Sequence, residues 1–381
     1  MAGNTVSQLA VRVGRHGHRA RRGRQRCASA ARRGGDRLPS NAGGAALSLD
    51  LSRLESLLDG FARVRLLVFG DVVLDEYIWG DVDRVSPEAP VPVVRVREET
   101  VMLGGAGNVV RNIVALGGGV SFCSVVGDDA AGRRVASLLK DLDVDPRGLV
   151  VADSRPTTRK TRVVARSQQI VRFDRETSER TDDDVAGRLR GVLESSLADC
   201  DGVVIEDYGK GVLAPPMGSD AMAIFRACNL PVVVDPKSDL ETFRGASLVK
   251  PNLREAELLS GIEIHDAQDL AAAAARMRED LGGADVIVTR GAEGMTLFEG
   301  GTKAVEVRTA PREVFDVQGA GDTTISALAL ALRAGASLLE AAVIANAAAG
   351  VVVGKVGTAT ASAAEVRELL RGAVEAAGAG S

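Results

Sequence analysis

The chain has 381 residues, enough for one large α/β domain or two small ones. Hydrophobic residues make up 45% and charged residues 26%, as in ordinary globular proteins, and no uninterrupted apolar stretch is long enough to span a bilayer. The four cysteines are far apart and only three histidines occur, which argues against a disulfide framework, a zinc site and histidine-based catalysis. This cysteine usage favours a reducing cytoplasm.

The formal net charge of −4 conceals an uneven distribution. Residues 1–46 contain ten arginines and one acid, a charge of +9, whereas the remaining 37 basic and 50 acidic residues give −13. We interpret 1–46 as a disordered Arg-rich extension before a domain at 47–375, and we expect no nucleic-acid partner for the acidic body. A misassigned start codon, an organellar targeting peptide and a basic nucleic-acid-binding arm are the alternatives for this extension.

From Arg63 onward, short apolar runs alternate with helical patterns. The predicted strands are Val64–Phe69, Val120–Val126, Gly202–Ile205, Pro231–Val234 and Val286–Thr289. The predicted helices are Asn108–Leu116, Ala130–Leu139, Val185–Leu197, Ala267–Leu281, Ile325–Ala334 and Leu338–Val353. This alternation predicts right-handed βαβ units, and therefore a mostly parallel sheet that helices cover on both faces.

Two segments interrupt that alternation. Residues 76–99 and 155–174 contain β-forming residues, alternating charges and prolines, but no helical period. We predict that both are antiparallel excursions that build a small β-lid over one edge of the sheet. Since ligands of open α/β sheets bind beyond the carboxyl ends of the strands, we expect the chemistry there and under the lid.

The strongest local signal is the segment Phe315–Thr324, with the sequence FDVQGAGDTT. Its glycines let the backbone N–H groups of Gly319, Ala320 and Gly321 point into one space at a helix N-terminus, where anions are favoured. Asp322 follows in the first turn of that helix. A carboxylate beside an anion hole suits phosphoryl transfer, because it can accept the proton of the attacking hydroxyl. The alternative role for Asp322 is a helix N-cap.

A second glycine cluster, GGAGN at residues 104–108, begins another helix. It does not match the dinucleotide fingerprint, and no clear parallel strand precedes it. The small residues Gly104 and Gly105 would admit a sugar, and Asn108 would hydrogen-bond its hydroxyl groups. A tight turn packed beneath the helix is the alternative.

The order of these two glycine segments resembles the two signatures of the ribokinase-like (PfkB) carbohydrate kinases, and the resemblance covers about residues 60–370. It implies a three-layer α/β/α sandwich with a β-lid, ATP and Mg²⁺ as cofactors, and a sugar as substrate. Asp322 matches the family's catalytic base, and Asp75 in GDVVLD matches the acid that binds sugar hydroxyls. Glu255, in the N-x-x-E element at 252–255, would reach Mg²⁺ through water. The implied ATP-binding residues are Asn252, Glu255, Thr289, Gly291, Gly294 and Asn346.

Within this family the chain is most similar to the heptose 7-phosphate kinases, the kinase half of bifunctional enzymes of lipopolysaccharide synthesis. Segments 84–93, 158–163, 168–174, 207–211 and 346–358 carry this similarity. It implies phosphorylation of the anomeric hydroxyl of D-glycero-D-manno-heptose 7-phosphate. A phosphorylated substrate requires cations, and the implied substrate contacts are Lys160, Arg162, Arg172, Tyr208 and Lys210. Solvated charges and ordinary turn residues are the alternative for these five.

Two departures from the family pattern bear on function. Gln318 stands where the family commonly has threonine, which places a longer amide beside the anion hole. The segment after Asp322 is too short for an adenylyltransferase domain, so we expect a stand-alone kinase, and we expect a homodimer formed through the lid. A kinase for another sugar and a catalytically weak sugar-binding paralogue remain alternatives.

Overall fold

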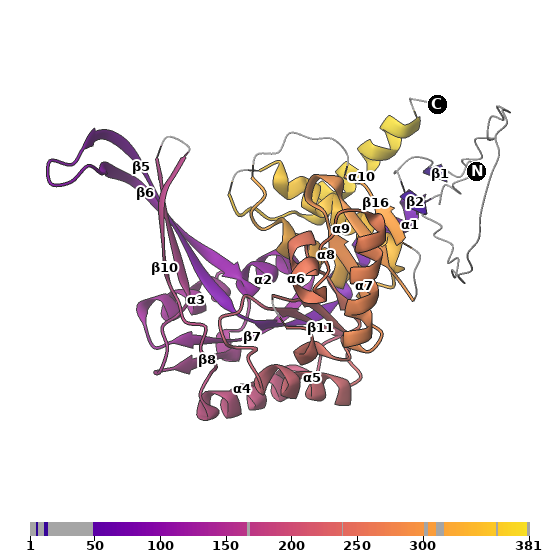
Figure 1. Ribbon diagram of the computed structural model, residues 1–381, viewed down its shortest axis with the longest axis horizontal. Helices are drawn as coiled ribbons and strands as arrows, with labels where there is room; N and C mark the ends of the chain where they lie inside the picture. The colour runs from indigo at the N-terminus through magenta and orange to yellow at the C-terminus, as the bar shows by residue number, and fades with distance from the viewer. Residues whose placement is uncertain are drawn as a thin grey trace, which may run out of the picture.

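The computed structural model describes residues 5–6, 11–13, 49–165, 168–237, 239–300, 304–309, 316–355 and 357–378. Ten strands form the main sheet, in the order β2–β16–β15–β14–β13–β12–β11–β4–β7–β8 (Figure 1). Their bounds are β2 Val11–Val13, β4 Arg65–Gly70, β7 Gly119–Gly127, β8 Leu149–Ala152, β11 Gly202–Glu206, β12 Val232–Asp235, β13 Leu248–Val249, β14 Asp285–Thr289, β15 Met295–Phe298 and β16 Ala304–Val307. From β14 to β8 all neighbours are parallel, whereas β15, β16 and β2 pair antiparallel. The predicted mostly parallel sheet is confirmed.

Alternate side chains of the central strands supply the two faces of this sheet. On β4, Leu66 and Val68 face one hydrophobic core, and Leu67 and Phe69 face the other. Helices α1 Leu51–Gly60, α2 Ala106–Ala115, α3 Ala130–Lys140, α8 Ala320–Arg333, α9 Leu338–Val353 and α10 Ala363–Gly378 cover the first face. Helices α4 Asp183–Ser196, α5 Met217–Ala227, α6 Leu253–Ser260 and α7 Ala267–Leu281 cover the second (Figure 1). The three-layer sandwich is therefore confirmed.

All the predicted strands and helices are present, with shifted ends. Helix α8 begins at Ala320 rather than Ile325, because its glycine-rich turn is already helical. The strands and α-helices that the sequence did not predict are β1, β2, β3, β8, β13, β15, β16, α1, α5, α6 and α10. Several are too short to show a period: β13, for example, has only 2 residues.

The lid is a separate four-stranded sheet in the order β10–β9–β5–β6, and it rises away from the body (Figure 1). Its strands are β5 Val72–Val85, β6 Pro92–Gly105, β9 Arg159–Ala165 and β10 Gln168–Arg175. Both hairpins, β5–β6 and β9–β10, are antiparallel, but β5 and β9 pair in parallel. The prediction of purely antiparallel excursions is therefore wrong at this one seam. Both strands leave the body toward the lid tip, so they run in the same direction.

Of the predicted extension 1–46, only β1 Thr5–Val6 and the edge strand β2 are described, and β1 pairs with β3 Leu49–Asp50. The rest of that segment lies outside the described residues, as does Phe315, so the boundary at residue 46 stays a prediction. Within the described ranges, no helix combines the length and apolar character needed to cross a membrane.

Candidate active site

Polar residues gather where the parallel strands of the main sheet end. Asp71 follows β4, Glu206 ends β11, Asp235 ends β12 and Lys250 follows β13. Parallel strands bring their carboxyl ends to one edge, and the N-terminus of α8 reaches that edge with Asp322. The structure thus brings the acid from the strongest sequence motif to the edge where chemistry was expected.

Asp322 is the third residue of α8 and is only 7% exposed. Its Oδ2 accepts a hydrogen bond from Asn108 Nδ2 at 2.6 Å, and its Oδ1 accepts one from the Tyr208 hydroxyl at 3.1 Å. Burial raises the pKa of the Asp322 carboxyl, while these two donors and the charge of Lys250 oppose the rise. The N-cap of α8 is Gly319, so the alternative role of Asp322 as N-cap is wrong.

The turn before Asp322 has the features of an anion site. Gly319 adopts φ 78°, a left-handed conformation that favours glycine, and α8 has no side-chain cap. The first amides of an uncapped helix are available to an anionic ligand. A Cβ on Gly321 would lie 3.8 Å from Lys250 Nζ, so a buried cation stands beside this turn. The predicted anion hole at Gly319, Ala320 and Gly321 keeps its geometric basis and stays a prediction.

Asp75 lies near the start of lid strand β5 and is 8% exposed. Its Oδ1 accepts a hydrogen bond from Arg162 Nη1 at 2.6 Å, and the Arg162 guanidinium stacks 5.2 Å from the ring centroid of Tyr77. A Cβ on Gly104 would overlap Asp75 Oδ2, so glycine is needed here for the carboxylate itself. The structure therefore holds Asp75 and Arg162 as a pair rather than as two independent substrate contacts.

Asn108 and Gly105 begin α2 on the same side of the site. Asn108 is fully buried, and its amide is directed to Asp322, which makes it a partner of the proposed base. Gly105 is the N-cap of α2 with φ 57°, and a Cβ there would lie 2.5 Å from the Asp71 carbonyl oxygen. The predicted contacts of these two residues with a sugar stay predictions.

The remaining lid and loop cations differ in their pairing. Lys210 Nζ lies 2.8 Å from Glu176 Oε1, and Arg172 Nε lies 2.9 Å from Asp174 Oδ1. In the described part of the chain, Lys160 has no ion-pair partner; its Nζ lies 5.9 Å from the ring centroid of Tyr208. Burial lowers the pKa of Lys160. Among the predicted phosphate ligands, Lys160 is therefore the one whose charge is not neutralised by an ion pair within the described residues.

The predicted Mg²⁺ and phosphate element begins α6. The Asn252 side chain accepts from Glu255 N at 2.9 Å, and Glu255 Oε2 accepts from Asn252 N at 3.0 Å, which together form a capping box. Lys237 Nζ lies 3.3 Å from Glu255 Oε1. Both residues therefore have a structural role, in addition to the nucleotide role that remains a prediction.

Thr289, Gly291 and Gly294 surround the turn between β14 and β15. Thr289 N donates to Pro251 O at 3.0 Å, which ties this turn to the start of α6. Asn346 on α9 accepts from Thr309 Oγ1 at 3.1 Å and donates to Arg308 O at 3.1 Å. The Asn346 amide thus joins α9 to the chain after β16. The contact of Asn346 with adenine stays a prediction.

Several residues of the site were not predicted. Lys250 Nζ lies 2.7 Å from Asp235 Oδ2, and the two side chains are 3% and 13% exposed. Glu206 is 2% exposed, and within the described residues its Oε2 has no hydrogen-bond partner. Burial and the nearby charge of Asp235 raise the pKa of Glu206. These residues could have been found in the sequence as the polar residues that directly end or follow an apolar strand, since each lies at the carboxyl end of a parallel strand.

Asp71 is a further residue of the site for which the sequence predicted no role. Its Oδ2 accepts from the backbone N–H groups of Tyr208 and Lys210, both at 3.0 Å, and its Oδ1 accepts from Val212 N at 3.1 Å. A buried carboxylate with three backbone donors fixes the loop after β11. This loop presents the Tyr208 hydroxyl to Asp322.

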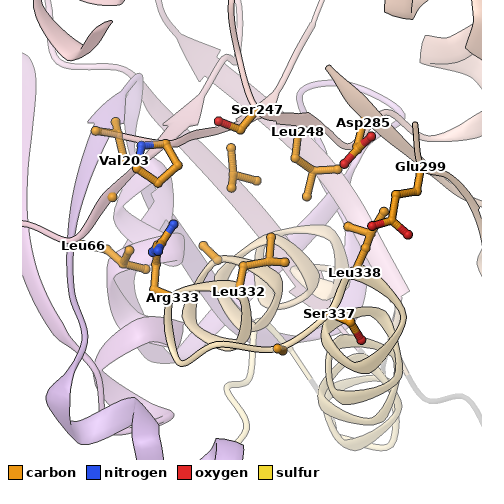
Figure 2. Close-up of a pocket in the computed structure, with 15 residues that line it drawn as sticks. Leu66, Val203, Ser247, Leu248, Asp285, Glu299, Leu332, Arg333, Ser337 and Leu338 are labelled. Carbon is orange, nitrogen blue, oxygen red and sulfur yellow. The ribbon is translucent and has the colours of Figure 1, made fainter. Parts of the chain in front are cut away.

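A cavity of about 290 Å³ lies at the opposite edge of the sheet, where the strands begin. Figure 2 shows it between the corner of α8 and α9 and the starts of the strands, with Arg333 near one end and Glu299 near the other. None of the predicted site residues lines it. The cavity is therefore separate from the candidate active site.

An acid in the first turn of a helix without a side-chain cap, beside a β-lid, is the arrangement expected of a phosphotransferase that acts on a hydroxyl group. Residues 65–365 match the model of the pfkB family carbohydrate kinases. The chain belongs to this family of carbohydrate kinases. The resemblance drawn from the glycine motifs is thereby confirmed.

The chain is 45% identical over 312 residues to the bifunctional protein HldE of Desulfatibacillum aliphaticivorans, covering 82% of this chain and 64% of that protein. It is 44% identical over 319 residues to the bifunctional protein HldE of Geobacter sulfurreducens, covering 84% and 65%. The chain therefore spans slightly less than two thirds of the length of these relatives.

Solved structures share the fold at lower identity. Arabidopsis thaliana ribokinase complexed with ribose and ATP has a TM-score of 0.64 at 22% identity, covering 81% of this chain and 99% of that one. The tetrameric inhibited form of Escherichia coli phosphofructokinase-2 has a TM-score of 0.68 at 20% identity, with the same coverage. Both confirm the ribokinase-like fold.

Proposed function

We propose that this kinase phosphorylates the anomeric hydroxyl of D-glycero-D-manno-heptose 7-phosphate, a step in the synthesis of the ADP-heptose precursor of lipopolysaccharide. The observation that carries the proposal is the position of Lys160, which lies over the Tyr208 ring while the Tyr208 hydroxyl donates to Asp322. One phenol ring therefore separates an uncommitted cation from the proposed base. A sugar with its reacting hydroxyl at Asp322 and a phosphate at its far end matches this spacing.

The reaction uses groups already in place. Asp322 accepts the proton as the sugar oxygen attacks the γ-phosphorus of ATP; the new O–P bond forms while the bond to the β-phosphate oxygen breaks, and ADP leaves. The amides at Gly319 and Gly321, with that of Ala320 once it leaves the Val317 carbonyl oxygen 3.4 Å away, and the nearby Lys250 would stabilise the charge on the phosphoryl group in transfer. The lid pair Asp75–Arg162 orients the sugar.

Mg²⁺ fits the donor set of this site. In the ranges that the structure describes, no three acidic, histidine or cysteine side chains converge as ligands for a metal. Mg²⁺ keeps several waters and binds through one or two carboxylates and the substrate phosphates, so it needs no such cluster. Glu255 would hold it through water. When bound, Mg²⁺ neutralises the charge that develops on the phosphates.

ADP release in the presence of ATP and Mg²⁺ tests the proposal across heptose 7-phosphate, fructose 6-phosphate, ribose and 2-keto-3-deoxygluconate. We expect a clear preference for heptose 7-phosphate. Preference for another sugar would agree with kinase activity but refute heptose 7-phosphate as the substrate. Folded protein that is silent on all four would favour a sugar-binding paralogue.

We also propose a cytoplasmic homodimer formed through the lid. The lid exposes apolar side chains on both hairpins: Val85, Val91, Val96, Ile170, Val171 and Phe173. A second copy of the lid would cover them, together with the open edges of β6 and β10. The described thiols of Cys123, Cys200 and Cys228 are free, which suits a reducing compartment. A monomeric mass in light scattering would refute the dimer.

A further inference from the structure

Arg111 lies on α2, one turn after Asn108, and its side chain is half-buried. Its Nη1 donates to Asn108 Oδ1 at 3.0 Å and to the Thr358 carbonyl oxygen at 3.1 Å. A guanidinium carries only donors, so it binds the oxygen of an amide and not the nitrogen. Arg111 therefore determines which end of the Asn108 side chain faces it.

The other end of the Asn108 amide faces Asp322. Its Nδ2 donates to Asp322 Oδ2 at 2.6 Å, the shorter of the two hydrogen bonds to this carboxylate. Asn108 is 0% exposed, so a reversed amide would place its oxygen against the carboxylate with no solvent between them. Such an arrangement would replace a charge-assisted hydrogen bond with repulsion between two acceptors.

We propose that Arg111 is a positioning residue of this kinase, which orients the Asn108 amide so that its N–H groups hold the Asp322 carboxylate. This inference rests on the proposed role of Asp322 as the base. It applies to whichever sugar the enzyme phosphorylates, because Arg111 acts through Asn108 and not through the substrate.

The charges around Asp322 set the direction of the expected effect. The titratable groups that act on it are Asp75 from the lid, Glu206 and Tyr208 from β11 and the loop after it, Asp235 from β12, Lys250 after β13 and Arg111 from α2. Removing Arg111 withdraws a positive charge and releases the donor to the carboxylate. Both changes favour the protonated acid, so the acid limb of the pH–rate profile should move to higher pH.

The test compares Arg111→Met, Arg111→Lys and the exposed control Arg134→Met in kcat, KM, melting temperature and the pH dependence of kcat/KM. For Arg111→Met we expect kcat to fall about tenfold, and the acid limb to rise by about one pH unit, with little change in KM. Arg111→Lys keeps a charged donor and should restore most of the rate. Arg134→Met should behave like the unaltered enzyme.

A double-variant cycle with Asn108→Ala shows whether Arg111 acts through Asn108. The shift caused by Arg111→Met should become smaller once Asn108 is alanine, because only the direct effect of the lost charge remains, whereas full additivity would overturn the proposal. A lowered melting temperature with an unshifted pH profile would also overturn it, because Arg111 would then be merely structural. If Arg111→Met does not fold, Arg111→Gln, which also removes the charge, takes its place in the cycle. High activity in Asp322→Asn would instead show that Asp322 is not the base. This result distinguishes failure of the proposed function from failure of the proposal for Arg111.

Discussion

The Tyr77 hydroxyl, on lid strand β5, donates a hydrogen bond to Gln318 Oε1 at 2.8 Å, in the turn that precedes Asp322. The same hydroxyl lies 3.2 Å from Thr358 Oγ1, so three distant segments meet at one phenol. Gln318 therefore extends from the anion-hole turn to the lid. The longer amide at this position joins the two parts of the active site, a role that a threonine side chain is too short to fill.

Tyr77→Phe should weaken the closure of the lid over the sugar. We expect KM for the sugar to rise about fivefold to tenfold, because one partly buried hydrogen bond is lost while the ring is kept. Saturating kcat should change little. Steady-state kinetics with varied sugar check this, and an unchanged KM in both Tyr77→Phe and Gln318→Thr would show that the contact has no part in binding.

Asp322→Asn should nearly abolish turnover. Loss of a general base typically lowers the rate by about 10²–10⁴-fold, while the isosteric amide leaves ATP and sugar binding largely intact. Because burial raises the pKa of Asp322, the active carboxylate form is lost as pH falls through that raised value. Single-turnover rates measure the loss of turnover, and calorimetry measures the retained binding of ATP and sugar. If more than a tenth of the activity remained, Asp322 would not be the base.

Lys160→Met should reduce affinity for a phosphorylated sugar. A charge-assisted contact with phosphate is worth about 1.5–3 kcal/mol, so KM should rise about 10–100-fold. Arg172→Met is the matched control, since Arg172 is already paired with Asp174 on the exposed lid. Equal effects of the two substitutions would show that Lys160 has no special place in phosphate recognition.

Gly104→Ala should displace Asp75, because the added Cβ would overlap its Oδ2. We expect a loss of about 1–3 kcal/mol in unfolding free energy and a raised KM for the sugar. Denaturant unfolding and kinetics measure these two quantities. Gly187→Ala is a suitable control, since a Cβ there meets no atom within 4 Å.

Asp207 provides a test of stability against pH. Burial, and next the charge of Asp71, raise its pKa from 3.8 to about 6. The folded state then holds this proton more tightly than the unfolded chain, so this carboxyl stabilises the fold at low pH. That contribution is lost as pH rises from about 4 to about 6, and amounts to roughly 3 kcal/mol. The melting temperature of Asp207→Asn relative to the unaltered protein should therefore be more favourable at pH 8 than at pH 4.5, and an equal difference at both would refute this.

Much of the fold could be predicted from the chain because its signals are local. The runs at Leu66–Phe69 and Gly202–Ile205 are short, buried and apolar, as in the strands of parallel sheets. The parallel pairing of β5 with β9 could not be predicted in this way. This pairing depends on how two hairpins that are far apart in the sequence meet. The alternation of apolar and polar residues within each hairpin carries no information about that contact.

The site divides along the same line. Asp322 and the glycines around it are a contiguous motif, so their role as a unit could be proposed from sequence. Asn108 could be identified as a site residue, but not its partner, because the bond to Asp322 joins residues that are 214 positions apart. Arg111 and Lys250 carry no motif, and only the packed arrangement of α2, β13 and α8 shows their positions.

Asp71 is the single residue between β4 of the main sheet and β5 of the lid, and it also holds the loop that carries Tyr208. The lid therefore has no independent hinge on this side. A displacement of the lid strand at Asp71 would therefore also displace the loop that presents the Tyr208 hydroxyl to Asp322. The lid and the proposed base thus share one anchoring residue.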